Sequence, residues 1–252
     1  TIPKGATRRE CYLDVDQMTE LYQCFLEKRY PEDWDTDWRE HTHESLGLFL
    51  VQYLCNGFNL ADAARLVYDD HYFKSGRKSF RFIRKKTEDR SDTEIVIPII
   101  VPLQKILDEI AAEPIKGSLV FPQIYAGEQN PEGMKARVSQ ENQNIRKRLG
   151  RLVKTMGWEV APSGTWCRHS FATNLSHAGG VPKEYIQEAM GHSVMSGTVT
   201  DRYIQTYPLA RQMEFNSKLL KVGNQVDIMG ELQGLTPDQI QALIEMVKKN
   251  KS

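Results

Sequence analysis

The 252 residues allow one large domain or two, and 33 basic side chains balance 33 acidic ones, so net charge alone indicates no polyanionic partner. No stretch reaches about eighteen uncharged apolar residues and no charged-then-apolar leader is present, which argues against a membrane span and predicts a soluble, intracellular protein. Four scattered cysteines without paired spacing argue against a disulfide framework and a zinc site.

The charges are nevertheless segregated along the sequence. Residues 14–44 hold ten acids and three bases, residues 74–90 eight bases and two acids, and residues 135–154 seven bases and one acid. Such segregation can make one face of the fold positive, which is typical of binding to a phosphate backbone. The alternative, which the sequence leaves open, is that each run is a solvated helix or hairpin edge.

Two helices are predicted in the first quarter of the chain. The first should run from Val15 to about Lys28, with Asp14 as N-cap and Gln17 closing a capping box. Residues 30–38 contain a proline and four acids and should form a loop. The second helix should then run to residue 56, because large apolar side chains recur at helical spacing.

Short strands are predicted next, at residues 67–73, 80–83 and 94–98, because these segments are rich in aromatic and β-branched residues. Residues 74–77 should form a hairpin turn between the first two. The alternation of Phe and Arg over residues 80–82 indicates a strand with one packed and one solvated face.

The middle of the chain predicts a helix over residues 102–112, a strand-like segment at 119–122 and a flexible loop at 127–133. A long helix should follow over residues 139–156, because one apolar stripe runs along it. Off this stripe lie basic side chains that can contact a phosphate backbone: Arg146, Lys147, Arg148, Arg151 and Lys154.

The stretch from Thr165 to Tyr203 carries the chemistry. It contains Arg168 and His169 in Thr-Trp-Cys-Arg-His-Ser-Phe-Ala-Thr, then His192 in Met-Gly-His-Ser, and finally the tyrosine in Asp-Arg-Tyr-Ile. Three successive short helices joined by glycine-rich turns are expected here. Arg can clamp a phosphate through two hydrogen bonds, His can exchange a proton near neutral pH, and Tyr can form a covalent ester. Together these are the parts of a phosphoryl-transfer site.

The order and spacing of these residues resemble the catalytic domain of the tyrosine recombinases, the phage-integrase family. The resemblance rests on Arg-His-Ser-Phe-Ala-Thr from Arg168, a Gly-His pair about two dozen residues later, and Tyr203 eleven residues after His192. It implies a mainly α-helical fold with a small antiparallel β-sheet (α+β), covering about residues 8–222. It also implies that Tyr203 attacks a DNA phosphodiester and forms a 3′-phosphotyrosyl link, with no metal and no nucleotide cofactor.

The family resemblance assigns a role to each residue. Arg168 would neutralise the pentacoordinate phosphate, and His192 would hydrogen-bond the phosphate or assist Tyr203. The turn that begins at Arg84 matches the hairpin in which the family keeps its catalytic Lys. Lys86 aligns best with that position and Lys85 is the alternative; its implied role is to protonate the leaving 5′ oxygen.

Two positions depart from the family pattern. Asn59 stands where members usually have the first catalytic Arg, and Thr165 stands where they have a His three residues before Arg168. An amide or a hydroxyl can hydrogen-bond a phosphate oxygen, but it cannot neutralise one. Arg65, two helical turns beyond Asn59, is a candidate substitute, whereas His169 should pack or cap. In having Asn59 in place of the first Arg and a long interval from His192 to Tyr203, the chain most resembles the integrases of conjugative transposons.

The end of the chain predicts a helix over residues 209–222, a linker over 223–234 and an amphipathic helix that begins with a capping box at Thr236. In the resembled family a C-terminal helix commonly docks on a neighbouring protomer, which implies a homo-oligomer on DNA, from dimer to tetramer. The alternative is that this helix folds back on its own domain. The arm or core-binding domain that usually precedes the catalytic domain has no counterpart in this sequence.

We therefore expect a site-specific recombinase or integrase of a mobile element that acts on double-stranded DNA in a prokaryotic cytoplasm, associated with the nucleoid when bound. The side chains expected to contact DNA are Arg84, Lys85, Arg146, Lys147 and Arg151. The alternative function is a recombinase-derived architectural or regulatory DNA-binding protein. It stays open because each missing charge would cost on the order of 2.7–4 kcal/mol of transition-state stabilisation if nothing replaced it.

Overall fold

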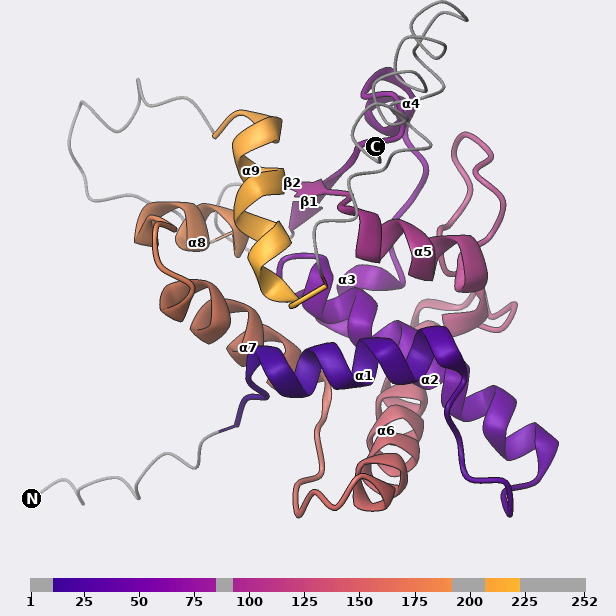
Figure 1. Cartoon of the computed structure of the whole chain (residues 1–252). Helices are drawn as coiled ribbons and strands as arrows, with labels where there is room; N and C mark the ends of the chain where they lie inside the picture. The colour runs from indigo at the N-terminus through magenta and orange to yellow at the C-terminus, as the bar shows by residue number, and fades with distance from the viewer. Residues whose placement is uncertain (1–10, 85–92, 192–206, 223–252) are drawn as a thin grey trace, which may run out of the picture. The chain divides into compact units, whose positions relative to one another are not determined.

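The computed structural model describes residues 11–84, 93–191 and 207–222, and up to Lys221 they belong to one compact unit (Figure 1). The described part is mainly helical with a two-stranded antiparallel sheet, which confirms the predicted fold class. The elements are α1 (Val15–Glu27), α2 (Thr36–Leu54), α3 (Leu60–Ala63), α4 (Asp70–Lys74), β1 (Ser79–Arg84), β2 (Thr93–Pro98), α5 (Val101–Ile110), η1 (Pro122–Ile124), α6 (Pro131–Thr155), α7 (Gly164–His177), α8 (Lys183–Ala189), α9 (Leu209–Asn216) and η3 (Ser217–Leu219).

Helix α1 begins where the sequence predicts. The Asp14 carboxylate accepts a hydrogen bond from the Gln17 backbone N–H at 2.8 Å, and the Gln17 side-chain oxygen accepts one from the Asp14 N–H at 3.1 Å. This reciprocal pair is the expected capping box. The predicted apolar face of the helix is buried: Met18, Leu21, Tyr22 and Phe25.

Helix α2 is the centre of the packing, because α1, α5, α6 and α7 all contact it. Every residue from Ser45 to Leu54 is buried. The helix begins at Thr36, so the predicted loop is shorter than residues 30–38, because the Asp35 carboxylate caps the Trp38 N–H at 2.7 Å. No membrane-spanning helix is found among the described residues, since none combines the necessary length with sufficient apolar character.

The predicted strand at residues 67–73 is wrong. Only Val67 forms an isolated bridge, with Leu119, and residues 70–74 form helix α4. The Asp69 side chain caps that helix by accepting from the Tyr72 N–H at 3.0 Å, and this local bond outweighs the β-propensity of the aromatic residues. The turn at residues 74–77 therefore joins a helix to β1, and the strand-like segment 119–122 is likewise only this bridge.

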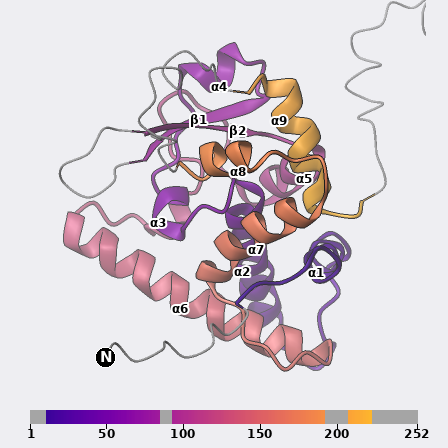
Figure 2. The ribbon, with the colours of Figure 1, turned by 90° about the vertical axis from the view of Figure 1, so that its left-hand side faces the viewer.

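Helix α6 is about two turns longer at its start than the predicted 139–156. It begins at Pro131, because Asn130 accepts from the Glu132 N–H at 3.1 Å and proline is well tolerated in the first turn. Its predicted stripe is buried at Ile145, Leu149, Leu152 and Val153. Figure 2 shows α6 crossing below α3, and it also contacts α2 and α7.

The sheet has the predicted alternation. Strand β1 pairs with β2 from Ser79 opposite Pro98 to Arg84 opposite Thr93. Phe80 and Phe82 are buried, whereas Arg81 between them is exposed. In sequence, residues 85–92 connect the two strands.

A chain of buried amides ties the end of α2 to the sheet and to the end of the described chain. Asn56 donates to the Val96 carbonyl at 3.0 Å and accepts from the Asn216 amide at 2.9 Å. Asn216 in turn accepts from the Tyr185 hydroxyl at 2.7 Å. The turn after α2, strand β2, α8 and α9 are therefore held together by one polar network.

Replacing Asn216 by Ala should reduce the free energy of unfolding by about 2–4 kcal/mol, because it leaves the Asn56 oxygen and the Tyr185 hydroxyl buried without a partner. Urea unfolding measures the loss. Ser217→Ala, a change at the exposed neighbour, should alter stability by less than about 0.5 kcal/mol. Equal effects of the two changes would contradict the network's role.

Candidate functional site

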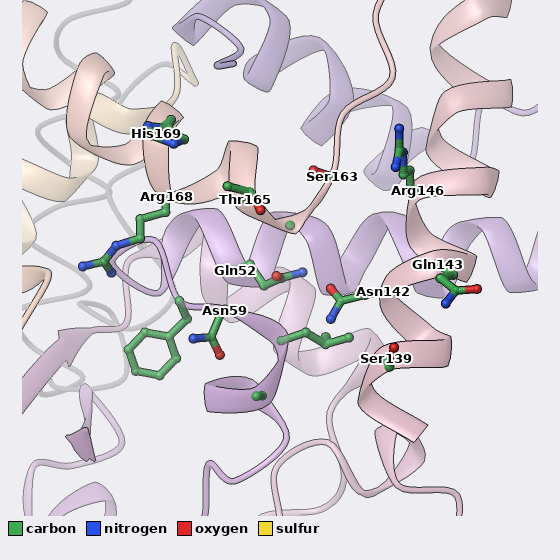
Figure 3. A pocket seen from close by; sticks show the side chains of 14 residues that line it. Gln52, Asn59, Ser139, Asn142, Gln143, Arg146, Ser163, Thr165, Arg168 and His169 are labelled. Atoms are coloured by element: carbon green, nitrogen blue, oxygen red, sulfur yellow. The ribbon is translucent and has the colours of Figure 1, made fainter. Parts of the chain in front are cut away.

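A pocket of about 500 Å³ lies between the turn after α2, the middle of α6 and the first turn of α7. Its lining includes four residues that the sequence singled out: Asn59, Thr165, Arg168 and Arg146. Figure 3 shows these side chains around a polar interior that also contains residues without a predicted role. Those additional polar residues are Gln52, Ser139, Asn142, Gln143 and Ser163, and His169, which was expected to pack or cap, also lines the pocket.

Arg168 lies at one end of the pocket and is half-buried. Its guanidinium donates to the Met190 carbonyl at 2.9 Å and to the Gly57 carbonyl at 3.4 Å. These carbonyls belong to the turn after α2 and to the C-terminal end of α8. The guanidinium is thereby held in a fixed position where three separate segments meet.

The turn after α2 allows this close approach because it contains a glycine. Gly57 has a φ of +68°, and a Cβ there would lie 3.0 Å from the Cα of Arg168 and 3.2 Å from the Cβ of Phe171. Helix α7 therefore packs directly against the backbone of the turn. Both the left-handed conformation and the lack of space favour glycine at this position.

Gly57→Ala should destabilise the fold more than the same change at a glycine of matched conformation. Gly76 has a φ of +67°, and a Cβ there would have nothing within 4 Å, so Gly76→Ala should cost only the backbone strain, about 1–2 kcal/mol. Gly57→Ala should cost roughly 1–3 kcal/mol more, because α7 must also shift. Urea unfolding of both variants measures the difference, and equal losses would show that the contact is not restrictive.

Asn59 and Thr165, the two uncharged residues that depart from the family pattern, both line the pocket and are exposed. Asn59 is the N-cap of α3, and its Oδ1 accepts from the Asp62 N–H at 2.8 Å. Its Nδ2 is therefore the group that it can offer to a ligand. Thr165 lies in the first turn of α7, three residues before Arg168 and so on the same face of the helix.

Arg65 is not among the residues that line the pocket. Its guanidinium donates to the buried Asp62 carboxylate at 2.8 Å and to the Ala61 carbonyl at 3.1 Å. It also lies over the Phe82 ring, 5.4 Å from the centroid. The structure thus places this candidate substitute against α3 and β1, outside the pocket that holds Asn59.

The basic side chains of α6 do not share one environment. Arg146 lines the pocket. Arg151 lies over the rings of Trp34 and Trp38, 4.8 and 5.1 Å from their centroids, and the Lys147 ammonium lies 5.4 Å from the Trp38 centroid. Arg146 is therefore the α6 residue that accompanies Arg168.

Four predicted site residues lie outside the described residues: Lys85, Lys86, His192 and Tyr203. Arg84 is the last residue of β1, and Lys85 and Lys86 follow it directly in the sequence. Met190, two residues before His192 in the sequence, is the residue whose carbonyl binds Arg168.

The chain after residue 206 is fixed against α8. The Tyr207 N–H donates to the Glu188 carboxylate at 3.3 Å, and its carbonyl accepts from Gln212 at 2.7 Å. Burial raises the pKa of the Glu188 carboxyl, and the hydrogen bond from Tyr207 opposes this shift. The Tyr207 ring packs edge-on to Tyr185, with centroids 5.5 Å apart. In sequence, the segment that contains the predicted nucleophile Tyr203 therefore lies between the end of α8 and Tyr207, which is itself bonded to α8.

Sequence reasoning missed several polar pocket residues, among them Gln52 and Asn142, and misplaced His169. His169 was expected to pack or cap, but it is exposed at the pocket, because α7 presents its first turns to solvent on that side. The sequence signal for Gln52 was a lone amide within the apolar run of α2. Asn142 carried no signal, because its position depends on how α6 packs.

Among the described residues, no group of His, Cys, Asp and Glu is placed to hold a metal ion.

Comparison with known proteins identifies a family for the chain. The model of the phage integrase family matches residues 39–209, which include all the described pocket residues. Among solved structures, the chain is similar to the XerH site-specific recombinase bound to its difH substrate in a pre-cleavage complex, with 15% identity and a TM-score of 0.44. The similarity covers 82% of this chain and 50% of that one, so the chain spans about half the length of that recombinase. No curated protein matches the chain.

Proposed function

The chain belongs to the phage integrase family, the tyrosine recombinases, and on this premise we propose that it is a site-specific recombinase that cleaves and rejoins DNA. The observation that carries the proposal is that Asn59, Thr165 and Arg168 line one pocket. These are three positions at which the family motif expects catalytic residues. Their convergence supports a phosphate-binding site.

In the proposed reaction the Tyr203 hydroxyl attacks the scissile phosphorus. A bond forms between phosphorus and the tyrosyl oxygen, and the bond to the 5′ oxygen breaks, which gives a 3′-phosphotyrosyl link. The Tyr203 hydroxyl gives up its proton to His192 or to water as the new bond forms, and Lys86 donates a proton to the leaving 5′ oxygen. Arg168 stabilises the negative charge, and His192 hydrogen-bonds the phosphate where it does not assist the tyrosine. Attack by another strand's 5′ hydroxyl reverses these steps, so no nucleotide cofactor is required.

Two neutral side chains take the places of a guanidinium and an imidazole in this mechanism. The Asn59 amide and the Thr165 hydroxyl can each donate to a phosphate oxygen, and both face the pocket that Arg168 closes. Asn59 at the position of the first Arg, with the long interval between His192 and Tyr203, supports a likeness to integrases of conjugative transposons.

The proposed partner is double-stranded DNA in a prokaryotic cytoplasm, bound through phosphate contacts of Arg84, Lys85, Arg146, Lys147 and Arg151. Arg146 has the strongest support, because it lines the same pocket as Arg168. We further propose that the catalytic domain covers residues 8–222 and that the helix after Thr236 docks on a second copy of the chain, giving a homo-oligomer on DNA.

A second function is favoured by one observation. Asn59 and Thr165 leave the pocket with fewer positive charges than the family mechanism uses, and Arg65, bonded to Asp62, does not enter it. An architectural or regulatory DNA-binding protein would need no catalytic charge at these positions. The two functions differ in whether a covalent adduct with DNA forms.

Tyr203→Phe should abolish covalent capture of DNA. A pool of nicked suicide duplexes with randomised cores is incubated with the protein, and adducts that survive denaturation are counted on gels. The native chain and Tyr207→Phe, a tyrosine variant from the end of the same segment, should both form adducts. Absence of adducts with the native chain, despite DNA binding in a mobility-shift assay, would favour the architectural function.

Arg168→Lys should reduce the rate of adduct formation by about 10²–10³-fold, although the charge is kept. An ammonium cannot hold the Met190 and Gly57 carbonyls and contact a phosphate with the same planar geometry. Arg146→Lys, which keeps a charge at the other end of the pocket, should reduce the rate less than about tenfold. The rate of adduct formation is measured for each variant from a time course with duplexes that the native chain captures. A fully active Arg168→Lys variant would show that this residue has no role in the mechanism.

A further inference from the structure

Two side-chain carbonyl oxygens converge at the inner end of the pocket. A Cβ on Gly164 would lie 2.7 Å from the Gln52 Oε1 and 3.2 Å from the Asn142 Oδ1, so both oxygens face the same few ångströms of space. Figure 3 shows Gln52 and Asn142 side by side in the middle of the pocket. Because the residue at 164 is a glycine, no side chain of its own fills this recess.

The orientation of the Gln52 amide makes the recess an acceptor site. Its Nε2 donates to the Leu48 carbonyl at 3.2 Å, which directs Oε1 toward the pocket. Gln52 is fully buried, and its Oε1 has no hydrogen-bond partner among the described residues. A buried carbonyl oxygen without a partner is unfavourable, so the recess is suited to a ligand that donates hydrogen bonds.

The charges around the recess indicate the class of ligand. Arg168 and Arg146 lie on opposite sides of Gln52 and Asn142 (Figure 3), and the lining contains no acidic side chain among the described residues. A DNA strand has the matching order of phosphate, neutral nucleoside and phosphate. A pocket of about 500 Å³ also has the size of a typical small-ligand site.

We propose that this recess binds one unpaired nucleotide of the DNA strand and recognises its base by an exocyclic amino group. The two N–H bonds of an amino group can donate to Gln52 Oε1 and Asn142 Oδ1 together, while Arg168 and Arg146 contact the flanking phosphates. A base must leave its stack to reach a buried glutamine, and this is least costly where a strand is already unpaired. The inference rests on the proposed function, because it assumes that the pocket binds DNA, and it adds a base preference beside the bound phosphate.

The test uses a minimal probe with the same order of groups, 2′-deoxyadenosine 3′,5′-bisphosphate. Its control is the same bisphosphate with unsubstituted purine, which differs by one amino group. Titration followed by NMR should shift the Gln52 side-chain amide signal and give about tenfold weaker binding for the control, equivalent to ~1.4 kcal/mol. Equal affinities, or shifts confined to residues outside the pocket, would overturn the proposal.

Variants separate the acceptor recess from general phosphate binding. Gln52→Met keeps the length of the side chain but removes the acceptor, so the adenine and purine probes should bind equally. Gly164→Ala fills the recess and should have the same effect through a residue that is not in the core. Arg146→Gln should weaken both probes alike and preserve their ratio. Thermal unfolding confirms that each variant is folded.

The two proposals fail in different ways. If the native chain forms Tyr203 adducts with duplex DNA but does not discriminate the two probes, the recess does not read a base and the recombinase function stands. If the probes are discriminated but no adduct forms, the recess stands and the catalytic function fails. If both Gln52→Met and Gly164→Ala still bind the adenine probe more tightly than the purine probe, the proposal that the recess recognises a base is also overturned.

Discussion

The guanidinium of Arg168 holds the site together, because it bonds two backbone carbonyls from segments that are distant in sequence. The Gly57 carbonyl comes from the turn after the central helix, and the Met190 carbonyl from the end of α8. The glycine lets α7 approach the turn closely enough for these bonds to form. The same residue therefore organises the fold around the pocket and places a positive charge in its lining, the charge that the proposed function assigns to phosphate binding.

The pocket combines this charge with neutral polar groups. Asn59 and Thr165, an amide and a hydroxyl, stand at the positions where the family motif has an arginine and a histidine, and the lining also includes Gln52 and Asn142. The proposed chemistry and the proposed base contact therefore concern one pocket.

Local interactions determined which parts of the fold could be predicted. The capping box of α1 and the alternation of β1 depend on neighbouring residues, and both were found as expected. The segment 67–73 failed because a single cap at Asp69 reversed an aromatic preference for strand. Gln52 could not be assigned to the pocket, because its exposure to the recess depends on the packing of α6 and α7 against α2.

Family motifs placed residues that periodicity could not. Asn59 and Thr165 are unremarkable as local sequence, and only their alignment with a known pattern brought them to attention. That pattern gave no means of telling that Arg65 lies outside the pocket, because its position depends on the Asp62 carboxylate, which binds it.

The amide chain that joins Asn56 to Asn216 has a consequence for biosynthesis. These partners are 160 positions apart, and Tyr53 bonds the Leu219 carbonyl across 166 positions. Contacts of such sequence separation close late and slow the folding of a domain. During translation the first helices leave the ribosome long before their partners exist, so the fold around the pocket can be completed only when nearly the whole domain has emerged.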